Sequence, residues 1–410
     1  MNDRYLKQYG EMAVKAGVNI QPGQTLIING PITAADLVHH CATAAYDAGA
    51  KEVVVHWADE KLSRIKMERT EKDVLCDVKP WIQDSYLQYI KSEGTAAILS
   101  ITGSDPQLYK GIDAEKVNAY SIARMKALAE YRDYTMASRI QWCVIAVPTA
   151  GWAKKVFPDL DEEQAMEKLW ETIFKVSRVE GDAVANWKSY AAQRAERRDR
   201  INAMRLKTLH FTSSNGTDLY IDLADDHIWG GVSEYSEAGV EFIPNMPTEE
   251  LFTAPHKDRV NGVVHGTKPY VYNGDLIDDF VLTFKDGKVV DFDAKQGKDL
   301  LKNLLDTDDG AISIGEVALV PASSPINREN ILFYNTLFDE NAACHIALGQ
   351  GYPGTVKGGE KMTVDELLAK GVNDSVIHED IMIGSADMNI TGICENGDTV
   401  ILFENGEWVF

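Results

Sequence analysis

The secondary-structure pattern of the sequence changes near residue 205, and this change limits the folds that the chain can adopt. Before that point, helical patterns alternate with β-branched apolar runs at residues 24–30, 51–57, 95–101 and 141–147. Strands separated by helices are typical of βαβ units and a parallel sheet. We therefore expect residues 1–205 to form a Rossmann-like α/β scaffold domain with a parallel sheet.

The second half of the sequence is dominated by hairpin signals. Asn215-Gly216, Asp286-Gly287 and Asn405-Gly406 each lie between runs of alternating apolar and polar residues, and such dipeptides favour tight two-residue turns. A chain of 410 residues also exceeds the size at which one hydrophobic core stops growing. We expect residues 206–410 to form a second, mostly antiparallel α+β domain.

The net charge of −22 is confined to this second half. Residues 1–205 carry 28 basic and 28 acidic side chains, whereas residues 206–410 carry 13 and 35. Such a field repels nucleic acid and anionic membranes and attracts cations, including metal ions and ammonium groups. We expect no nucleic-acid and no membrane partner, although an acidic excess also simply keeps a protein soluble.

The ends and the cysteines favour a cytoplasmic protein. The first thirty residues contain no continuous apolar run of the kind found in signal peptides, and no stretch is apolar enough to span a membrane. The five cysteines are an odd number without CxxC spacing, which argues against a disulfide framework or a zinc ribbon.

A glycine-rich segment, GQGYPG at residues 349–354, matches the pattern GxGxxG. A dinucleotide site needs this loop between a strand and a helix whose amino terminus receives the pyrophosphate. The continuation is polar and interrupted by glycines, so a loop is favoured. The first strand-loop-helix segment has only Gly30 at the corresponding place. A nucleotide-dependent oxidoreductase is therefore the less favoured function, and we keep it as the alternative.

Histidine and acidic residues of the second half suggest a metal site. His378 and Asp380 alternate in VIHEDIMIG, which places both on one face of an expected strand. His345 precedes the glycine-rich loop, and Glu249 and Glu250 are adjacent in PTEELFTAP. Taken singly, each of these residues is more often structural than functional.

Glu316 lies among apolar residues in IGEVALVP. A carboxylate in such a strand is expensive to bury unless it is paired or ligates a metal ion. With the other acidic and histidine side chains it would suit a pair of divalent ions, which can polarise a carbonyl and activate a water.

These motifs resemble those of the M29 family of metallo-aminopeptidases, the thermophilic aminopeptidase family. The resemblance covers essentially the whole chain, and its specific part is the ordered set PTEELFTAPH, GEVALVP, AACHIALGQGYP and VIHEDIMIG. It implies hydrolysis of peptides from a free amino terminus by a water that two divalent ions (Zn, Co or Mn) activate. It further implies a homodimer with enclosed active sites.

The resemblance also assigns roles to particular residues. Five of them are implied metal ligands: Glu250, Glu316, His345, His378 and Asp380. Tyr352 matches a tyrosine that donates a hydrogen bond to the tetrahedral intermediate. Glu249 is the candidate general base, although neighbouring side chains on a regular strand point to opposite faces. A non-catalytic peptide-binding relative is a further alternative, and it should have lost at least one ligand.

Overall fold

The computed structural model describes residues 3–92, 95–272 and 275–410. The chain divides into two compact units, which we call unit 1 (Met1–Ala191 with Ser233–Pro247) and unit 2 (Ala192–Val232 with Thr248–Phe410). The division falls inside helix α10 (Ala183–Ala203), and a later segment belongs to unit 1. The domain limits 1–205 and 206–410 stay a prediction.

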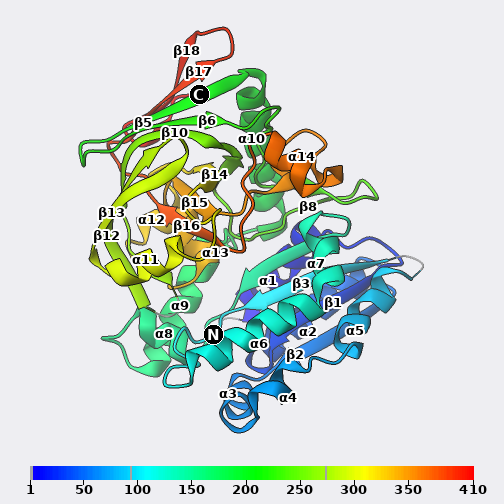
Figure 1. The fold of residues 1–410 in the computed structure, drawn as a ribbon. Helices are drawn as coiled ribbons and strands as arrows, with labels where there is room; N and C mark the ends of the chain where they lie inside the picture. Colours follow the sequence, from blue (N-terminus) through cyan, green and yellow to red (C-terminus); the bar gives the residue numbers. More distant parts are fainter. Residues whose placement is uncertain (1–2, 93–94, 273–274) are drawn as a thin grey trace. The chain divides into compact units, whose positions relative to one another are not determined.

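Unit 1 is built on a four-stranded parallel sheet with the order β2-β1-β3-β4 (Figure 1). Its strands are β1 (Thr25–Pro31), β2 (Glu52–Ala58), β3 (Ala96–Thr102) and β4 (Trp142–Ala146). Each strand is followed by helical structure, as the sequence predicted. A short antiparallel pair, β7 (Glu234–Tyr235) and β8 (Glu241–Phe242), lies in the later segment of unit 1. The predicted α/β class is confirmed.

Unit 1 also contains a series of α-helices. They are α1 (Asp3–Met12), α2 (Ala35–Asp47), α3 (Glu60–Arg69), α4 (Lys72–Cys76), α5 (Trp81–Ile90), α6 (Ala114–Ala127), α7 (Ala129–Met136), α8 (Ala150–Val156) and α9 (Glu162–Val176). Helix α2 contacts β1 and β2, and α5 contacts β3, so that Ile27 and Ile98 are buried in a common core. Among the described residues, no helix is both long and apolar enough to cross a membrane.

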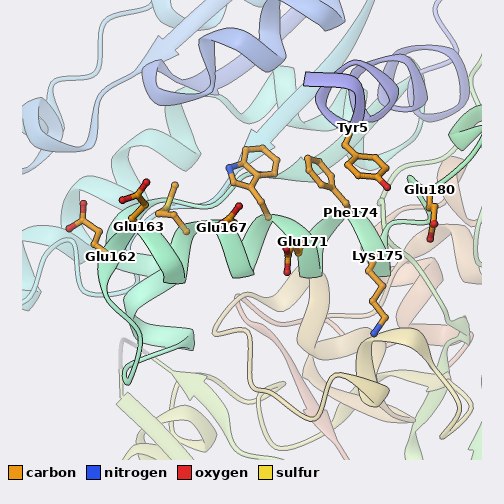
Figure 2. Close-up of a pocket in the computed structure, with 10 residues that line it drawn as sticks. Tyr5, Glu162, Glu163, Glu167, Glu171, Phe174, Lys175 and Glu180 are labelled. Carbon is orange, nitrogen blue, oxygen red and sulfur yellow. The ribbon is translucent and has the colours of Figure 1, made fainter. Parts of the chain in front are cut away.

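One face of α9 carries an open hollow of 880 Å³. The rings of Trp170 and Phe174 stack there, with their centroids 5.0 Å apart. The ring centroid of Tyr5, from α1, lies 5.6 Å from that of Phe174. Figure 2 shows Tyr5 beside Phe174, with glutamates such as Glu163 and Glu167 along the same helix. All lining residues belong to unit 1.

Unit 2 contains a large antiparallel sheet with the order β11-β12-β10-β6-β5-β17-β18-β19 and with β13 paired to β12. Its strands are β5 (Leu206–Thr212), β6 (Asp218–Leu223), β10 (Pro255–His265), β11 (Tyr270–Tyr272), β12 (Asp275–Lys285), β13 (Lys288–Gln296), β17 (Asn389–Cys394), β18 (Thr399–Glu404) and β19 (Glu407–Trp408). The predicted hairpins are confirmed. Asp286 and Gly287 have φ of 48° and 81°, and Asn405 and Gly406 have 50° and 74°, as tight hairpin turns require.

A second, smaller sheet of unit 2 has the order β16-β15-β14-β9, with every pair antiparallel. Its strands are β9 (Leu251–Thr253), β14 (Ile314–Leu319), β15 (His345–Gly349) and β16 (His378–Met382). Strand β14 packs against β10 of the large sheet. Four short helices complete the unit: α11 (Lys298–Leu305), α12 (Pro325–Arg328), α13 (Thr336–Asp339) and α14 (Val364–Ala369). The smaller sheet and the segment just before β9 carry the acidic and histidine motifs that the sequence analysis singled out.

Candidate metal centre

Four of the five predicted ligands lie on one face of the smaller sheet. His378 and Asp380 are two residues apart on β16 and therefore share a face. Asp380 is opposite Ala347 of β15, and Ala347 is opposite Glu316 of β14. His345 is two residues before Ala347 on the same strand. Strand register thus brings together side chains from three strands.

Glu250, the fifth predicted ligand, enters from the segment just before β9. It is two residues before Phe252, which is opposite Ala318 of β14, and Ala318 is in turn opposite His345. Glu250 therefore approaches the same face. The small side chains of Ala318 and Ala347 leave room above the sheet between the larger polar groups.

The distances show that all five side chains meet. The Nε2 atom of His345 lies 3.1 Å from Oε2 of Glu250, 3.7 Å from Oε1 of Glu316 and 4.0 Å from Oδ1 of Asp380. The Nε2 atom of His378 lies 3.6 Å from Oε2 of Glu316 and 3.5 Å from Oδ1 of Asp380. We call these five residues the carboxylate–histidine cluster.

Both histidines are oriented by main-chain carbonyl groups. Nδ1 of His345 donates to the carbonyl of Ala343 at 3.1 Å, and Nδ1 of His378 donates to the carbonyl of Gln350 at 2.7 Å. A hydrogen on Nδ1 leaves Nε2 as the nitrogen with a free lone pair. In each ring this Nε2 is the atom that faces the carboxylates.

The glycine-rich loop shapes the edge of the cluster instead of binding a dinucleotide. Gly349 has φ of +102°, and a Cβ there would lie 2.3 Å from the carbonyl oxygen of Ile377. Only glycine allows β15 to end this close to the start of β16. The loop continues through a 3-10 turn at Pro353–Thr355, and the next helix, α14, begins only at Val364. The expected loop is confirmed.

Tyr352, in this loop, lies beside the cluster. Its ring centroid is 4.7 Å from that of His378 and 6.1 Å from that of Phe252. Burial and the nearby carboxylates of Glu316 and Asp380 raise the pKa of the Tyr352 hydroxyl well above its usual value. The hydroxyl is therefore protonated at neutral pH and can donate a hydrogen bond.

Glu340 is a further acidic residue of the site, and the sequence motifs did not reveal it. It begins the 3-10 turn Glu340–Ala342, which packs against β16. Burial, followed by the charges of Glu250 and Asp380, raises the pKa of Glu340 well above its usual value. The only sequence signal was an acidic residue shortly before His345, in a segment with no strand pattern.

Glu249 has a buried side chain, and its main chain is held by neighbouring side chains. Its N–H donates to Oδ1 of Asn341 at 2.6 Å, and its carbonyl accepts from the guanidinium of Arg194. The charges of Glu250, Glu316 and Asp380 act on the pKa values of Glu340 and Tyr352. The role of Glu249 as general base stays a prediction.

The electrostatics of the cluster favour occupation by a divalent cation. Burial and the neighbouring Glu250 raise the pKa of Glu316 to about 7, because like charges crowd in a site with little water. The ligand atoms of Glu250, Glu316 and His345 all lie within 4.8 Å of one another. Carboxylate and imidazole donors together suit Zn, Co or Mn, so the donor set fits the predicted ions.

We expect cation binding to release protons and to strengthen as the pH rises. Burial lowers the pKa of both histidines, but the nearby carboxylates raise it by more. The net effect is a pKa well above the usual value for His345 and a pKa of about 10 for His378. The metal-free rings thus hold protons at neutral pH that a ligating Nε2 must lose. Calorimetric titration with Co²⁺ at about pH 6 and about pH 8 tests this. Equal affinity at both pH values, with no proton release, would contradict it.

The chain is similar to known metalloproteases and aminopeptidases over nearly its whole length. Residues 2–408 match the profile of a family described as thermophilic metalloprotease (M29). The chain is 47% identical over 409 residues to Aminopeptidase 2 of Geobacillus stearothermophilus, covering all of this chain and 98% of that protein. It is 43% identical to Aminopeptidase AmpS of Bacillus subtilis, covering 99% and 98%. The solved structure of wild-type AmpT from Thermus thermophilus superposes with a TM-score of 0.92 at 37% identity, covering 99% of both chains.

Proposed function

The chain belongs to the M29 family of metallo-aminopeptidases, and we propose that it releases amino-terminal residues from peptides with two divalent ions held by the carboxylate–histidine cluster. The observation that carries this proposal is the convergence of five predicted ligands from four segments on one sheet face. The family description and the relatives named as aminopeptidases support the activity.

The five side chains of the cluster would hold the ions, and Zn, Co and Mn all suit such mixed oxygen and nitrogen donors. When bound, ions of this kind polarise a scissile carbonyl and lower the pKa of a water molecule. Glu316 would contribute to holding the ions through both carboxylate oxygens, since Oε1 faces His345 and Oε2 faces His378. The backbone carbonyls of Ala343 and Gln350 keep each ring in the orientation that binding requires.

Two side chains of the chain itself would act on the substrate. We assign Tyr352 to donate a hydrogen bond to the carbonyl oxygen on which negative charge develops, a role that its raised pKa and its place beside His378 support. A carboxylate must carry the proton from the attacking water to the leaving amine. Glu249 and Glu340 are the two candidates for this role, and the nearness of Glu340 to the cluster favours it.

The activity is tested by the requirement for a free amino terminus. Amino-acyl chromogenic amides should be cleaved, whereas the same amides with an acetylated α-amino group should not. A longer peptide should be shortened one residue at a time, as mass spectrometry of timed samples would show. Internal cleavage of an amino-blocked peptide would overturn the exopeptidase proposal.

We further propose that the chain acts as a cytoplasmic homodimer, as the family resemblance implies. The described cysteines Cys41, Cys76, Cys143, Cys344 and Cys394 are free thiols, which fits a reducing compartment. Sedimentation equilibrium should give twice the chain mass of 45.5 kDa. A particle of the single chain mass would overturn the dimer.

A further inference from the structure

Asn341 is a fully buried amide in the turn that carries Glu340. Its side chain is completely inaccessible to solvent, and a buried amide is stable only when its polar atoms are hydrogen-bonded. Its Oδ1 accepts from the N–H of Glu249 at 2.6 Å. Its Nδ2 donates to the carbonyl of Leu337 and to Oε1 of Glu340, both at 3.2 Å.

The first of these bonds fixes the peptide that precedes Glu250. Strand β9 begins at Leu251, so the neighbouring strand does not hold the Glu249 peptide through the sheet pairing. Side chains hold it instead: Asn341 accepts from its N–H, and the buried Arg194 donates to its carbonyl. The direction in which the Glu250 side chain leaves the chain therefore depends on these two contacts.

The second bond holds an acidic group that belongs to a different segment. The turn Glu340–Ala342 packs against β16, which carries His378 and Asp380. Through one carboxamide, Asn341 thus reaches both Glu340 and the main chain beside Glu250. The two segments are about ninety residues apart in the sequence, so Asn341 links two distant parts of the chain at the site.

We infer that Asn341 is a positioning residue that holds Glu250 and Glu340 together in the arrangement a divalent cation requires. This inference rests on the proposed metal-dependent function. Without the carboxamide, the Glu249 peptide and the Glu340 side chain lose the hydrogen bonds that fix their positions. Cation binding must then fix these positions itself, which lowers affinity. Groups that orient metal ligands typically contribute about 10-fold to 100-fold to metal affinity.

The test is calorimetric titration of the full-length, chelator-dialysed chain with Co²⁺. We expect Asn341→Ala to raise the Kd for Co²⁺ by about 10-fold to 100-fold. The control is Asn186→Ala in unit 1, where Nδ2 likewise makes two hydrogen bonds, both to main-chain carbonyls, those of Arg178 at 3.0 Å and Glu180 at 2.7 Å. The control removes two side-chain hydrogen bonds from the other unit and should keep its Kd for Co²⁺ within about twofold.

Asn341→Asp serves as the second variant should Asn341→Ala fail to fold. Aspartate keeps the size and the acceptor for the Glu249 N–H, but a carboxylate has no hydrogen to donate to Glu340. We expect its Kd to rise by at least about tenfold. A folded Asn341 variant that binds Co²⁺ as tightly as the unsubstituted chain would overturn the inference. Failure of the unsubstituted chain to bind Co²⁺ would overturn the proposed function instead.

Discussion

Replacement of Glu316 by alanine is expected to abolish divalent-ion binding and peptidase activity together. Oε1 of Glu316 lies 3.7 Å from Nε2 of His345, and Oε2 lies 3.6 Å from Nε2 of His378. Asp380 also approaches both rings, but through the single oxygen Oδ1, at 4.0 Å and 3.5 Å. Ions in such sites supply several kcal/mol of transition-state stabilisation, so kcat/KM should fall by at least about a thousandfold.

Two quantities are measured on the purified variant. Elemental mass spectrometry gives its metal content, and hydrolysis of an amino-acyl chromogenic amide gives its activity. Glu379→Gln is the matched control because Glu379 lies between His378 and Asp380 on β16 but faces the other side of the sheet. That variant should retain its metal and its activity. Full activity in metal-free Glu316→Ala would remove the cluster from the mechanism.

The second large effect is expected at Glu340. The Glu340→Gln substitution should lower kcat by about 10²-fold to 10⁴-fold, the usual range for loss of a proton-transferring group. Its carboxylate is close enough to Glu250 and Asp380 for their charges to raise its pKa. Glutamine preserves the shape and the acceptor for Asn341, so the loss should appear in kcat more than in folding.

Glu249→Gln is the informative partner variant, because Glu249 is the general base that the sequence predicts. Its main chain is held by Asn341 and Arg194, and Glu250 is the neighbour that reaches His345. We expect Glu249→Gln to lower kcat by less than about tenfold. A large loss for Glu249→Gln with an unaffected Glu340→Gln, each at full metal content, would assign the role of general base to Glu249.

The sequence predicted the fold well where local patterns and turn residues agree. The β-branched runs of unit 1 form β1 to β4, and the Asp286-Gly287 and Asn405-Gly406 turns form hairpins. The period of two in a strand was enough to predict that His378 and Asp380 share a face of β16. The full ligand set came from the family resemblance, since spacing alone left each residue with a structural explanation.

Other parts of the site depend on tertiary register, which no local pattern encodes. Ala347 lies between Glu316 and Asp380 only because β14 shifts its register between Ile314 and Glu316. Gly315, the extra residue there, has no room for a Cβ, which would lie 2.4 Å from Gln350. Long-range packing decides such shifts, so the sequence could not show them.

Glu340 and Asn341 were missed for a different reason. They lie in a 3-10 turn without a strand or helix period, so their side chains had no predictable direction. The sequence also does not show which of Glu249 and Glu250 faces the cluster. Two adjacent glutamates are equivalent until the path of the chain is known. The polar groups around the ligands were therefore less predictable than the ligands themselves.

The central claim is that activity resides in divalent ions bound by the carboxylate–histidine cluster of unit 2. The most direct measurement follows hydrolysis of an amino-acyl chromogenic amide while Co²⁺ is added stepwise to the chelator-dialysed chain. The number of metal ions bound per chain is measured at each step. We predict that the dialysed chain is inactive, that activity returns as ions bind up to two per chain, and that Glu316→Ala neither binds nor recovers. Undiminished hydrolysis by the metal-free chain, or full recovery in Glu316→Ala, would contradict the claim.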